Sequence, residues 1–158
     1  MARKTERPII FPLSNPTSHS EAEPADLLAW TDGRALIATG SPFAPVLYNG
    51  RTVEIAQCNN VFIFPAVGLA VIGSRARRVT DKMLLAGARA LGDNSPALRD
   101  PAGSLLPRVN TIRELTLDVA YAIGREAQEG GLAFGSDPYT LRARLSDTQW
   151  FPEYIPYL

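Results

Sequence analysis

Two adjacent side-chain amides precede an apolar run that ends at a proline, in the stretch CNNVFIFP of residues 58–65. An amide both donates and accepts hydrogen bonds, so one amide can contact the carboxylate and the hydroxyl of a hydroxy acid. The same chemistry also caps the start of a helix, which is the competing interpretation for Asn59. Asn59 and Asn60 are therefore candidate ligand contacts, with capping as the alternative.

Two other polar segments follow apolar runs that are typical of strands. Residues 14–17 read SNPT and residues 39–42 read TGSP. Asn15 carries the same bifunctional amide, although Asn-Pro is also a common way to begin a turn. Gly40 is explained equally well as a turn glycine. A structural turn thus stays open as the alternative at both segments.

The elements that must position these residues are strands and helices in alternation. Residues 7–14 are predicted to form a buried strand, with Pro12 indicating an edge or a bulge. Ser20 and Glu23 have the spacing of a capping box, which predicts a helix to about Trp30 before the turn at Asp32-Gly33. Residues 35–41 are the next expected strand. This order predicts a parallel α/β sheet, in which ligands bind beyond the carboxyl ends of the strands.

The remainder of the chain is predicted to be mostly helical after one hairpin. Asn49-Gly50 is a strong signal for a two-residue hairpin turn within residues 46–55. A buried helix to Gly73, interrupted or restarted at Pro65, is expected next, and a helix from Thr80 to about Leu91 follows it. A loop is expected over 92–107. The last expected helices run from the capping pair Thr111 and Glu114 to Gly130-Gly131, and for a short distance from Asp137-Pro138. The aromatic tail QWFPEYIPYL is expected to pack on another surface.

Composition restricts the class of protein. The chain has 158 residues, is 46% hydrophobic and 20% charged, and has a formal net charge of +0. These values are typical of a soluble globular domain, or of part of a larger protein, and favour neither nucleic acid nor a membrane as partner. No run approaches the length of a membrane span, and the N-terminus lacks the apolar core of a secretory signal. With one cysteine no internal disulfide forms, so a reducing, cytoplasmic location is expected.

Several kinds of site are not found in the sequence. It contains no G-x-G-x-x-G turn, no P-loop, no His and Cys cluster and no paired carboxylates for a hard cation. His19, the only histidine, lies in a polar loop and is not expected to hold a metal. Cys58 is expected to be a small buried side chain rather than a nucleophile, because no base lies near it in sequence. No catalytic residue and no metal ligand is therefore predicted.

Four blocks give the chain a specific resemblance. In order and spacing, RPIIFPLSNPTS, GRALIATGSPF, NNVFIFPAVGLAVI and TDKMLLAGARAL resemble the C-terminal part of malic enzymes, over about residues 7–92. The sequence departs from the family pattern at Ala56-Gln57-Cys58, where Gly-Gln-Gly is usual, and at Ala66, where glycine is usual. Each replacement removes freedom for close backbone approach.

The resemblance implies a fold and a set of ligands. The expected fold is α/β, the C-terminal half of a Rossmann-like NAD(P)-binding domain (residues 1–92) with a helical C-terminal extension (93–158). Malic enzymes oxidise malate with NAD or NADP and decarboxylate the product, using magnesium or manganese. The resemblance implies that Asn15 and Asn60 contact malate and that Asn15 and Asn59 lie beside the cofactor.

The resemblance also implies what the chain does not supply. The family's tyrosine acid, lysine base, three carboxylate metal ligands and glycine-rich cofactor turn would lie upstream in a complete enzyme. We therefore expect the chain to contribute part of an active site and to be inactive alone, with an upstream malic-enzyme fragment or a second copy of the chain as partner. The alternative is a non-catalytic remnant or interaction module that binds NAD weakly or docks on a partner.

Overall fold

The computed structural model describes residues 1–154, which divide into two compact units. Unit 1 comprises residues 1–62 and 91–113, and unit 2 comprises residues 63–90 and 114–158. The chain therefore leaves unit 1 and returns to it between the two parts of unit 2. The boundary that the sequence suggests at residue 92 stays a prediction.

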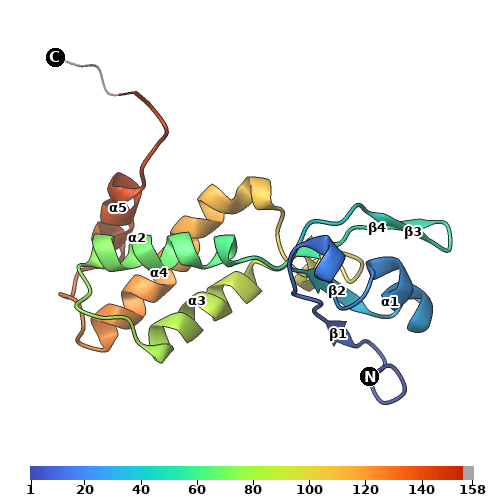
Figure 1. The fold of residues 1–158 in the computed structure, drawn as a ribbon. Coiled ribbons are helices and arrows are strands. Elements are labelled where there is room, and N and C mark those ends of the chain that lie inside the picture. The colour runs from blue at the N-terminus through green and yellow to red at the C-terminus, as the bar shows by residue number, and fades with distance from the viewer. Residues whose placement is uncertain (155–158) are drawn as a thin grey trace. The chain divides into compact units, whose positions relative to one another are not determined.

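Unit 1 contains a small parallel sheet. Strands β1 (Ile9–Ile10), β2 (Leu36–Thr39) and β5 (Ala56–Gln57) are arranged in the order β1-β2-β5. Figure 1 labels the first two of these strands. Both pairings are parallel, with Ile10 opposite Ile37 and Thr39 opposite Gln57. The predicted parallel α/β arrangement is confirmed.

The connections of unit 1 follow from local turn chemistry. Helix α1 (Pro24–Trp30) joins β1 to β2 and ends where Asp32 and Gly33 take positive φ angles of 52° and 71°. Between β2 and β5 the chain forms the antiparallel hairpin of β3 (Val46–Tyr48) and β4 (Arg51–Val53). Asn49 and Gly50 both have positive φ, as the predicted two-residue turn requires.

The core of unit 1 lies between α1 and the sheet. Leu27 and Leu28 of α1 are buried with Ala35 and Ile37. Partly buried side chains from β1, from the segment before α1 and from the hairpin and the residues after it surround them: Ile10, Ala22, Val46, Tyr48, Val53 and Ile55. Helix α1 is thus held on the sheet by one apolar face, although it spans only seven residues.

Two local predictions for unit 1 are wrong. Residues 7–14 form a strand only at Ile9–Ile10, and the predicted burial is wrong because Ile9 is 52% exposed. The edge position that Pro12 indicated is confirmed, since β1 is an outer strand of the sheet. The capping box does not form either. Helix α1 begins at Pro24 with Glu23 as its N-cap residue, and the hydroxyl of Ser20 donates instead to the carbonyl of Ala22. A proline in the first turn already has a helical φ and needs no partner for an N–H group.

Unit 2 is helical. Its helices are α2 (Phe64–Ser74), α3 (Asp81–Asp93, whose last residues belong to unit 1), α4 (Ile112–Glu129, which begins in unit 1) and α5 (Pro138–Thr148) (Figure 1). Their predicted starts are close: Pro65 lies in the first turn of α2, the hydroxyl of Thr80 accepts a bond from the N–H of Met83, and Asp137 caps α5. Short 3-10 turns, η3 (Pro96–Leu98) and η4 (Val109–Thr111), punctuate the long loop of unit 1.

Small residues allow the helices of unit 2 to approach closely. A methyl group on Gly73 of α2 would lie 2.7 Å from Cδ2 of Leu145 in α5. A methyl group on Gly87 of α3 would lie 2.8 Å from Cδ1 of Ile123 in α4. Leu145 and Ile123 are buried at 1% and 0% exposure. The core of unit 2 therefore combines large side chains of α4 and α5 with glycines of α2 and α3.

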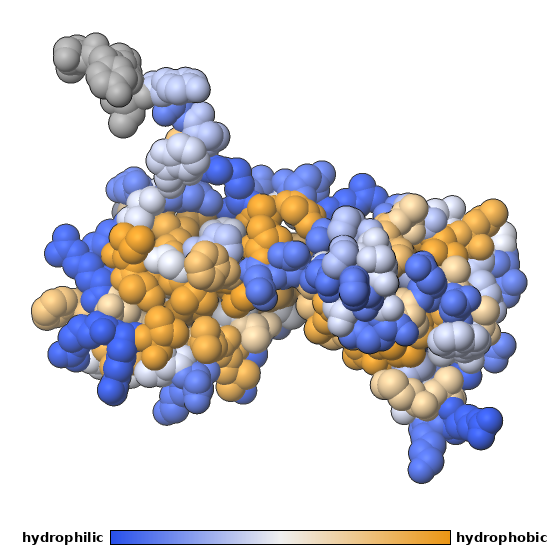
Figure 2. Space-filling model, in the orientation of Figure 1, coloured by the Kyte–Doolittle hydropathy of each residue, from blue (hydrophilic) through white to orange (hydrophobic). Residues whose placement is uncertain are grey.

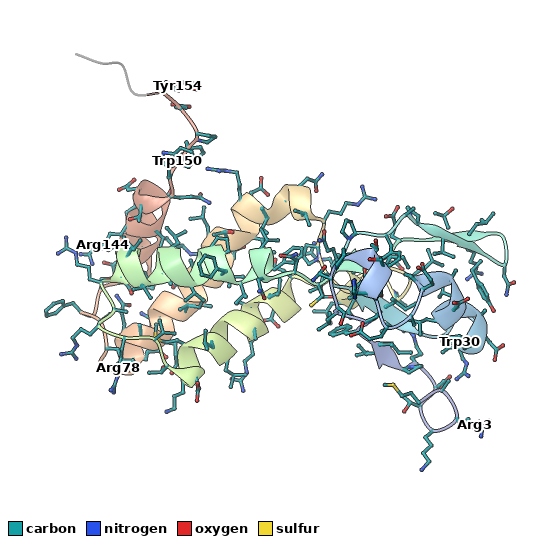
Figure 3. The ribbon with its side chains drawn as sticks, in the orientation of Figure 1. Arg3, Trp30, Arg78, Arg144, Trp150 and Tyr154 are labelled. Carbon is teal, nitrogen blue, oxygen red and sulfur yellow. The ribbon has the colours of Figure 1, made fainter. Side chains whose placement is uncertain are left out.

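The described part of the aromatic tail is exposed. Trp150 and Tyr154 follow α5 on an extended segment and point away from the helices of unit 2 (Figure 3). Their exposed fractions are 72% and 103%. Residues 155–158, which belong to the same predicted tail, lie outside the described residues. Packing of the tail on another surface stays a prediction.

Replacing Leu145 by alanine tests the packing of unit 2. The change should lower the free energy of unfolding by about 2–5 kcal/mol, because it leaves a cavity at the contact between α2 and α5. Leu85→Ala is the matched control, since Leu85 of α3 is 50% exposed, and it should stay within about 0.5 kcal/mol of the wild type. Urea unfolding measures both, and equal losses in the two variants would contradict this description of the core.

Candidate functional site

Three polar segments follow the three parallel strands of unit 1. Because the strands are parallel, their carboxyl ends lie at the same end of the sheet. Backbone bonds join the segments: the N–H of Gly40 donates to Pro12 at 3.0 Å, and the N–H of Cys58 donates to Thr39 at 2.8 Å. This end of the sheet therefore carries Asn15 after β1, Ser41 after β2 and Asn59-Asn60 after β5, in the position where α/β sheets bind ligands.

The side chain of Asn15 is exposed, but hydrogen bonds hold both its Nδ2 and its Oδ1. Its Nδ2 donates to the carbonyl of Leu13 at 3.3 Å. Its Oδ1 accepts a hydrogen bond from the hydroxyl of Ser41, which is buried. The Asn15–Pro16 peptide bond is cis. With one N–H of Nδ2 used, the second N–H remains as a donor for a ligand.

The loop that carries Asn15 is also held by hydrogen bonds between Ser14 and Glu21. The N–H of Ser14 donates to Oε2 of Glu21 at 3.2 Å, and the Ser14 hydroxyl donates to Oε1 at 2.7 Å. The Ser14 hydroxyl, and after it the backbone N–H groups of Glu21 and Ser14, lower the pKa of Glu21 from its usual value. The carboxylate form of Glu21 is therefore the form that closes this loop.

Gly40 is required by space. A methyl group on its Cα would lie 2.1 Å from the carbonyl oxygen of Leu13 and 3.1 Å from Nδ2 of Asn15. The obstacle is backbone, which cannot move aside as a side chain can. The interpretation of Gly40 as a turn glycine is replaced by a more specific one: it lets the chain after β1 cross the end of β2.

The two adjacent amides differ in their environment. Oδ1 of Asn59 accepts from the N–H of Val61 at 3.0 Å, and the carbonyl of Asn59 accepts from Phe62 at 3.1 Å. Asn59 thus caps the 3-10 turn η2 (Asn60–Phe62), as the alternative interpretation has it. Asn60 is exposed, and its side chain makes no hydrogen bond within residues 1–154. Phe62, 1% exposed, anchors the turn that presents it.

The structure adds two residues that sequence reasoning did not select. Ser41 contacts Asn15, and Nε2 of Gln57 donates to the carbonyl of Gly40 at 3.4 Å. Ser41 lies in the segment 39–42 that the sequence marked as a polar strand end, whereas Gln57 lies before the Asn59-Asn60 segment. The sequence contains no signal that Ser41 faces Asn15 or that Gln57 faces Gly40, because both contacts depend on strand order.

A pocket of about 520 Å³ opens in unit 1 beside the end of β5. Gln57 is on its wall, together with Phe43 and an exposed ion pair in which Arg108 lies 3.5 Å from Glu54. The loop of residues 102–109 forms the opposite wall. The lining mixes apolar, amide and paired charged groups and carries no excess of one charge.

Other kinds of site are not found in the described part of the chain. Residues 1–154 bring together no group of three His, Cys, Asp or Glu side chains that could hold a metal ion. Among the same residues, no helix is both long and apolar enough to cross a membrane. Cys58 is half-buried, and burial raises the pKa of its thiol, which disfavours the thiolate.

Sequence comparison relates the chain to one family. The family model described as malic enzyme, NAD binding domain, matches residues 1–128. An NAD-dependent malic enzyme of Idiomarina loihiensis is 49% identical over 157 residues, and one of Edwardsiella ictaluri is 52% identical over 151 residues. The matches cover 99% and 96% of this chain but 28% and 27% of the relatives. The chain thus spans little more than a quarter of their length.

Solved structures share the fold. A crystal structure of the malic enzyme of Entamoeba histolytica aligns with a TM-score of 0.69 at 23% identity, over 90% of this chain and 26% of that one. The malic enzyme of Pyrococcus horikoshii aligns with a TM-score of 0.65 at 26% identity, over 89% of this chain and 29% of that one. The predicted Rossmann-like α/β class is therefore confirmed.

Gly40→Ala tests the crossing at the strand ends. The added methyl group should destabilise unit 1 by about 3 kcal/mol or more, the upper part of the range for overpacking, because it meets a backbone carbonyl. Gly92→Ala is the control, since nothing lies within 4 Å of the added atom and alanine favours the helix. Urea unfolding should show the loss only for Gly40→Ala. A Gly40→Ala chain as stable as the control would show that the crossing is not tight.

The bond between Glu21 and Ser14 should respond to acid. Because the folded pKa of Glu21 is lowered, its contribution is complete above the usual glutamate pKa and is lost as pH falls through the lowered value. The amide resonance of Ser14, followed by NMR, should therefore titrate below the usual glutamate range. Glu21→Gln should remove that titration. A midpoint at or above the usual glutamate pKa in the wild type would contradict the assignment.

Proposed function

The chain belongs to the malic enzyme family, and from this membership we propose that it supplies malate and NAD contacts for the oxidative decarboxylation of malate to pyruvate and CO₂. In this proposal Asn15 and Asn60 bind malate, and Asn15 and Asn59 lie beside NAD. The acid, the base and the metal ligands are contributed by parts of the enzyme other than these residues. The isolated chain is therefore inactive in this proposal.

The observation that carries the proposal is the hydrogen-bonding state of the two substrate amides. Asn15 is oriented by Ser41 and Leu13 and keeps one N–H for a ligand. Asn60 is exposed on a turn that Phe62 and Asn59 hold in place. Held donors next to the carboxyl ends of parallel strands are suited to a ligand that presents carboxylate oxygens.

The two roles within the Asn pair are separable. The side-chain Oδ1 of Asn59 accepts from the N–H of Val61, which leaves its NH₂ group as the donor for a ligand. That group suits a cofactor neighbour that accepts a hydrogen bond. Asn60 keeps both halves of its amide and can donate to a carboxylate while it accepts from a hydroxyl. Malate carries both of these groups on adjacent carbons.

The described residues are suited to the cofactor but not to the metal ion. Exposed amides at the strand ends are suited to the carboxamide of a nicotinamide, and NAD, when bound, supplies the acceptor for the hydride of malate. The chain's own residues orient the substrate against it, which raises the rate by holding the reacting atoms in place. The described residues do not fit a magnesium or manganese ion, because no suitable ligand group is assembled within residues 1–154.

A second candidate function is docking on a partner, and the surface of unit 2 favours it. Helix α2 is apolar along its whole length, and Phe64 and Ile72 are 75% and 67% exposed. Figure 2 shows hydrophobic side chains gathered over α2 and α3, where Leu84 and Leu85 are also exposed. A helix that is apolar all round is normally buried. In this second function the chain is a non-catalytic interaction module, and a partner protein would cover this surface.

Binding by the labelled chain distinguishes the two functions. Malate should shift the side-chain NH₂ resonances of Asn15 and Asn60, and NAD those of Asn15 and Asn59, in NMR titrations of the ¹⁵N-labelled chain. Asn60→Ala should weaken malate binding about tenfold or more, as loss of a hydrogen bond to a charged group predicts.

Asn110→Ala is the matched control, because Asn110 is an exposed amide of unit 1 in the turn η4. It should leave malate binding unchanged. If malate and NAD move none of the three amides, the proposed site is wrong and the docking function is favoured.

A further inference from the structure

We propose that Ser41 is a positioning residue, which orients the amide of Asn15 so that its NH₂ group faces the ligand. The inference deepens the proposed function, since it rests on Asn15 contacting malate or NAD. It assigns to the site a preference for ligand groups that accept a hydrogen bond there, namely a carboxylate or a carboxamide oxygen.

Ser41 is itself held firmly. It lies after the end of β2, with Gly40 between, and is 6% exposed. The hydroxyl of Thr39, which is fully buried, donates to the carbonyl of Ser41 at 2.8 Å. The N–H of Gly40, between them, donates to Pro12 at 3.0 Å. The Ser41 hydroxyl is therefore fixed in position at the carboxyl ends of the strands, whereas Asn15 lies on an exposed loop.

The two bonds to Asn15 define its orientation together. With Oδ1 toward the Ser41 hydroxyl, Nδ2 donates to Leu13. A flipped amide would place Oδ1 against the Leu13 carbonyl, and two acceptors would face each other without a proton between them. In the observed orientation, Oδ1 is engaged by Ser41 and the second N–H of Nδ2 is the open donor. The carbonyl of Leu13 is backbone, so Ser41 is the partner that substitution can remove.

A purely structural role makes a different prediction. If the hydroxyl of Ser41 only satisfied a buried polar group, its removal would change stability without changing the direction of the Asn15 amide. A positioning role requires a change at Asn15 that the fold does not share. The side-chain NH₂ resonances of Asn15, assigned by their loss in Asn15→Asp, report that orientation directly.

The test compares three variants of the full chain by NMR. Ser41→Ala should shift the Asn15 NH₂ resonances toward those of a free amide, while the backbone resonances of β2 and β5 stay in place. Ser41→Thr, which keeps a hydroxyl, should restore them. Ser95→Ala is the control, because Ser95 is also buried in unit 1 and its hydroxyl donates to the carbonyl of Leu105 at 2.6 Å, away from Asn15.

Titration with malate and with NAD then links orientation to binding. Where the wild-type Asn15 resonances respond to a ligand, Ser41→Ala should weaken binding of that ligand about three- to tenfold, the effect of one neutral hydrogen bond, and Ser41→Thr should recover it to within about twofold. Asn60 should respond to malate in every variant.

Unchanged Asn15 resonances in Ser41→Ala would overturn the inference. General loss of the β2 and β5 resonances in Ser41→Ala would also overturn it, because the role would then be structural. If neither ligand moves Asn15 in the wild type, the proposed function fails instead, and the effect of Ser41 on the Asn15 resonances still decides the orientation.

Discussion

The close passage of the chain after β1 over the end of β2 is the constraint on which the candidate site depends. Gly40 has no side chain, and its N–H bonds to Pro12 while its Cα lies against the Leu13 carbonyl. Any larger residue would separate the two segments. Their proximity places the hydroxyl of Ser41 at the amide of Asn15, and it places the Gly40 carbonyl within reach of Gln57 from β5. Through these contacts, Gly40 links the segments at the carboxyl ends of the three strands.

The amides of the proposed site are held by hydrogen bonds to different degrees. Asn15 is bound on both sides of its amide and offers one N–H. Asn59 serves the backbone of η2, and Asn60, beside it, is exposed. An amide that is already oriented loses less conformational entropy on binding than a free one. The site thus combines one preorganised donor with one adaptable amide.

Unit 2 illustrates a different balance between local structure and packing. Its helices have ordinary starts and ends, but α2 exposes large apolar side chains on one face while the glycine at 73 accommodates Leu145 on another. Burial of that exposed face would be favourable by the hydrophobic effect alone. In the proposed docking function, this face is the surface that a partner covers.

Local sequence determined much of this protein: the parallel α/β pattern, the Asn49-Gly50 hairpin, the helix starts at Thr80 and Asp137, and, through resemblance, the family. These features depend on neighbours in the chain, whose preferences are visible in the residues. The tertiary structure alone decided that β1 spans only Ile9–Ile10, that Glu23 rather than Ser20 is the N-cap of α1, and that Gly40 allows close approach of the backbone. It also revealed Ser41 as the partner of Asn15. That contact joins residues 26 positions apart, and only the order of strands in the sheet brings them together.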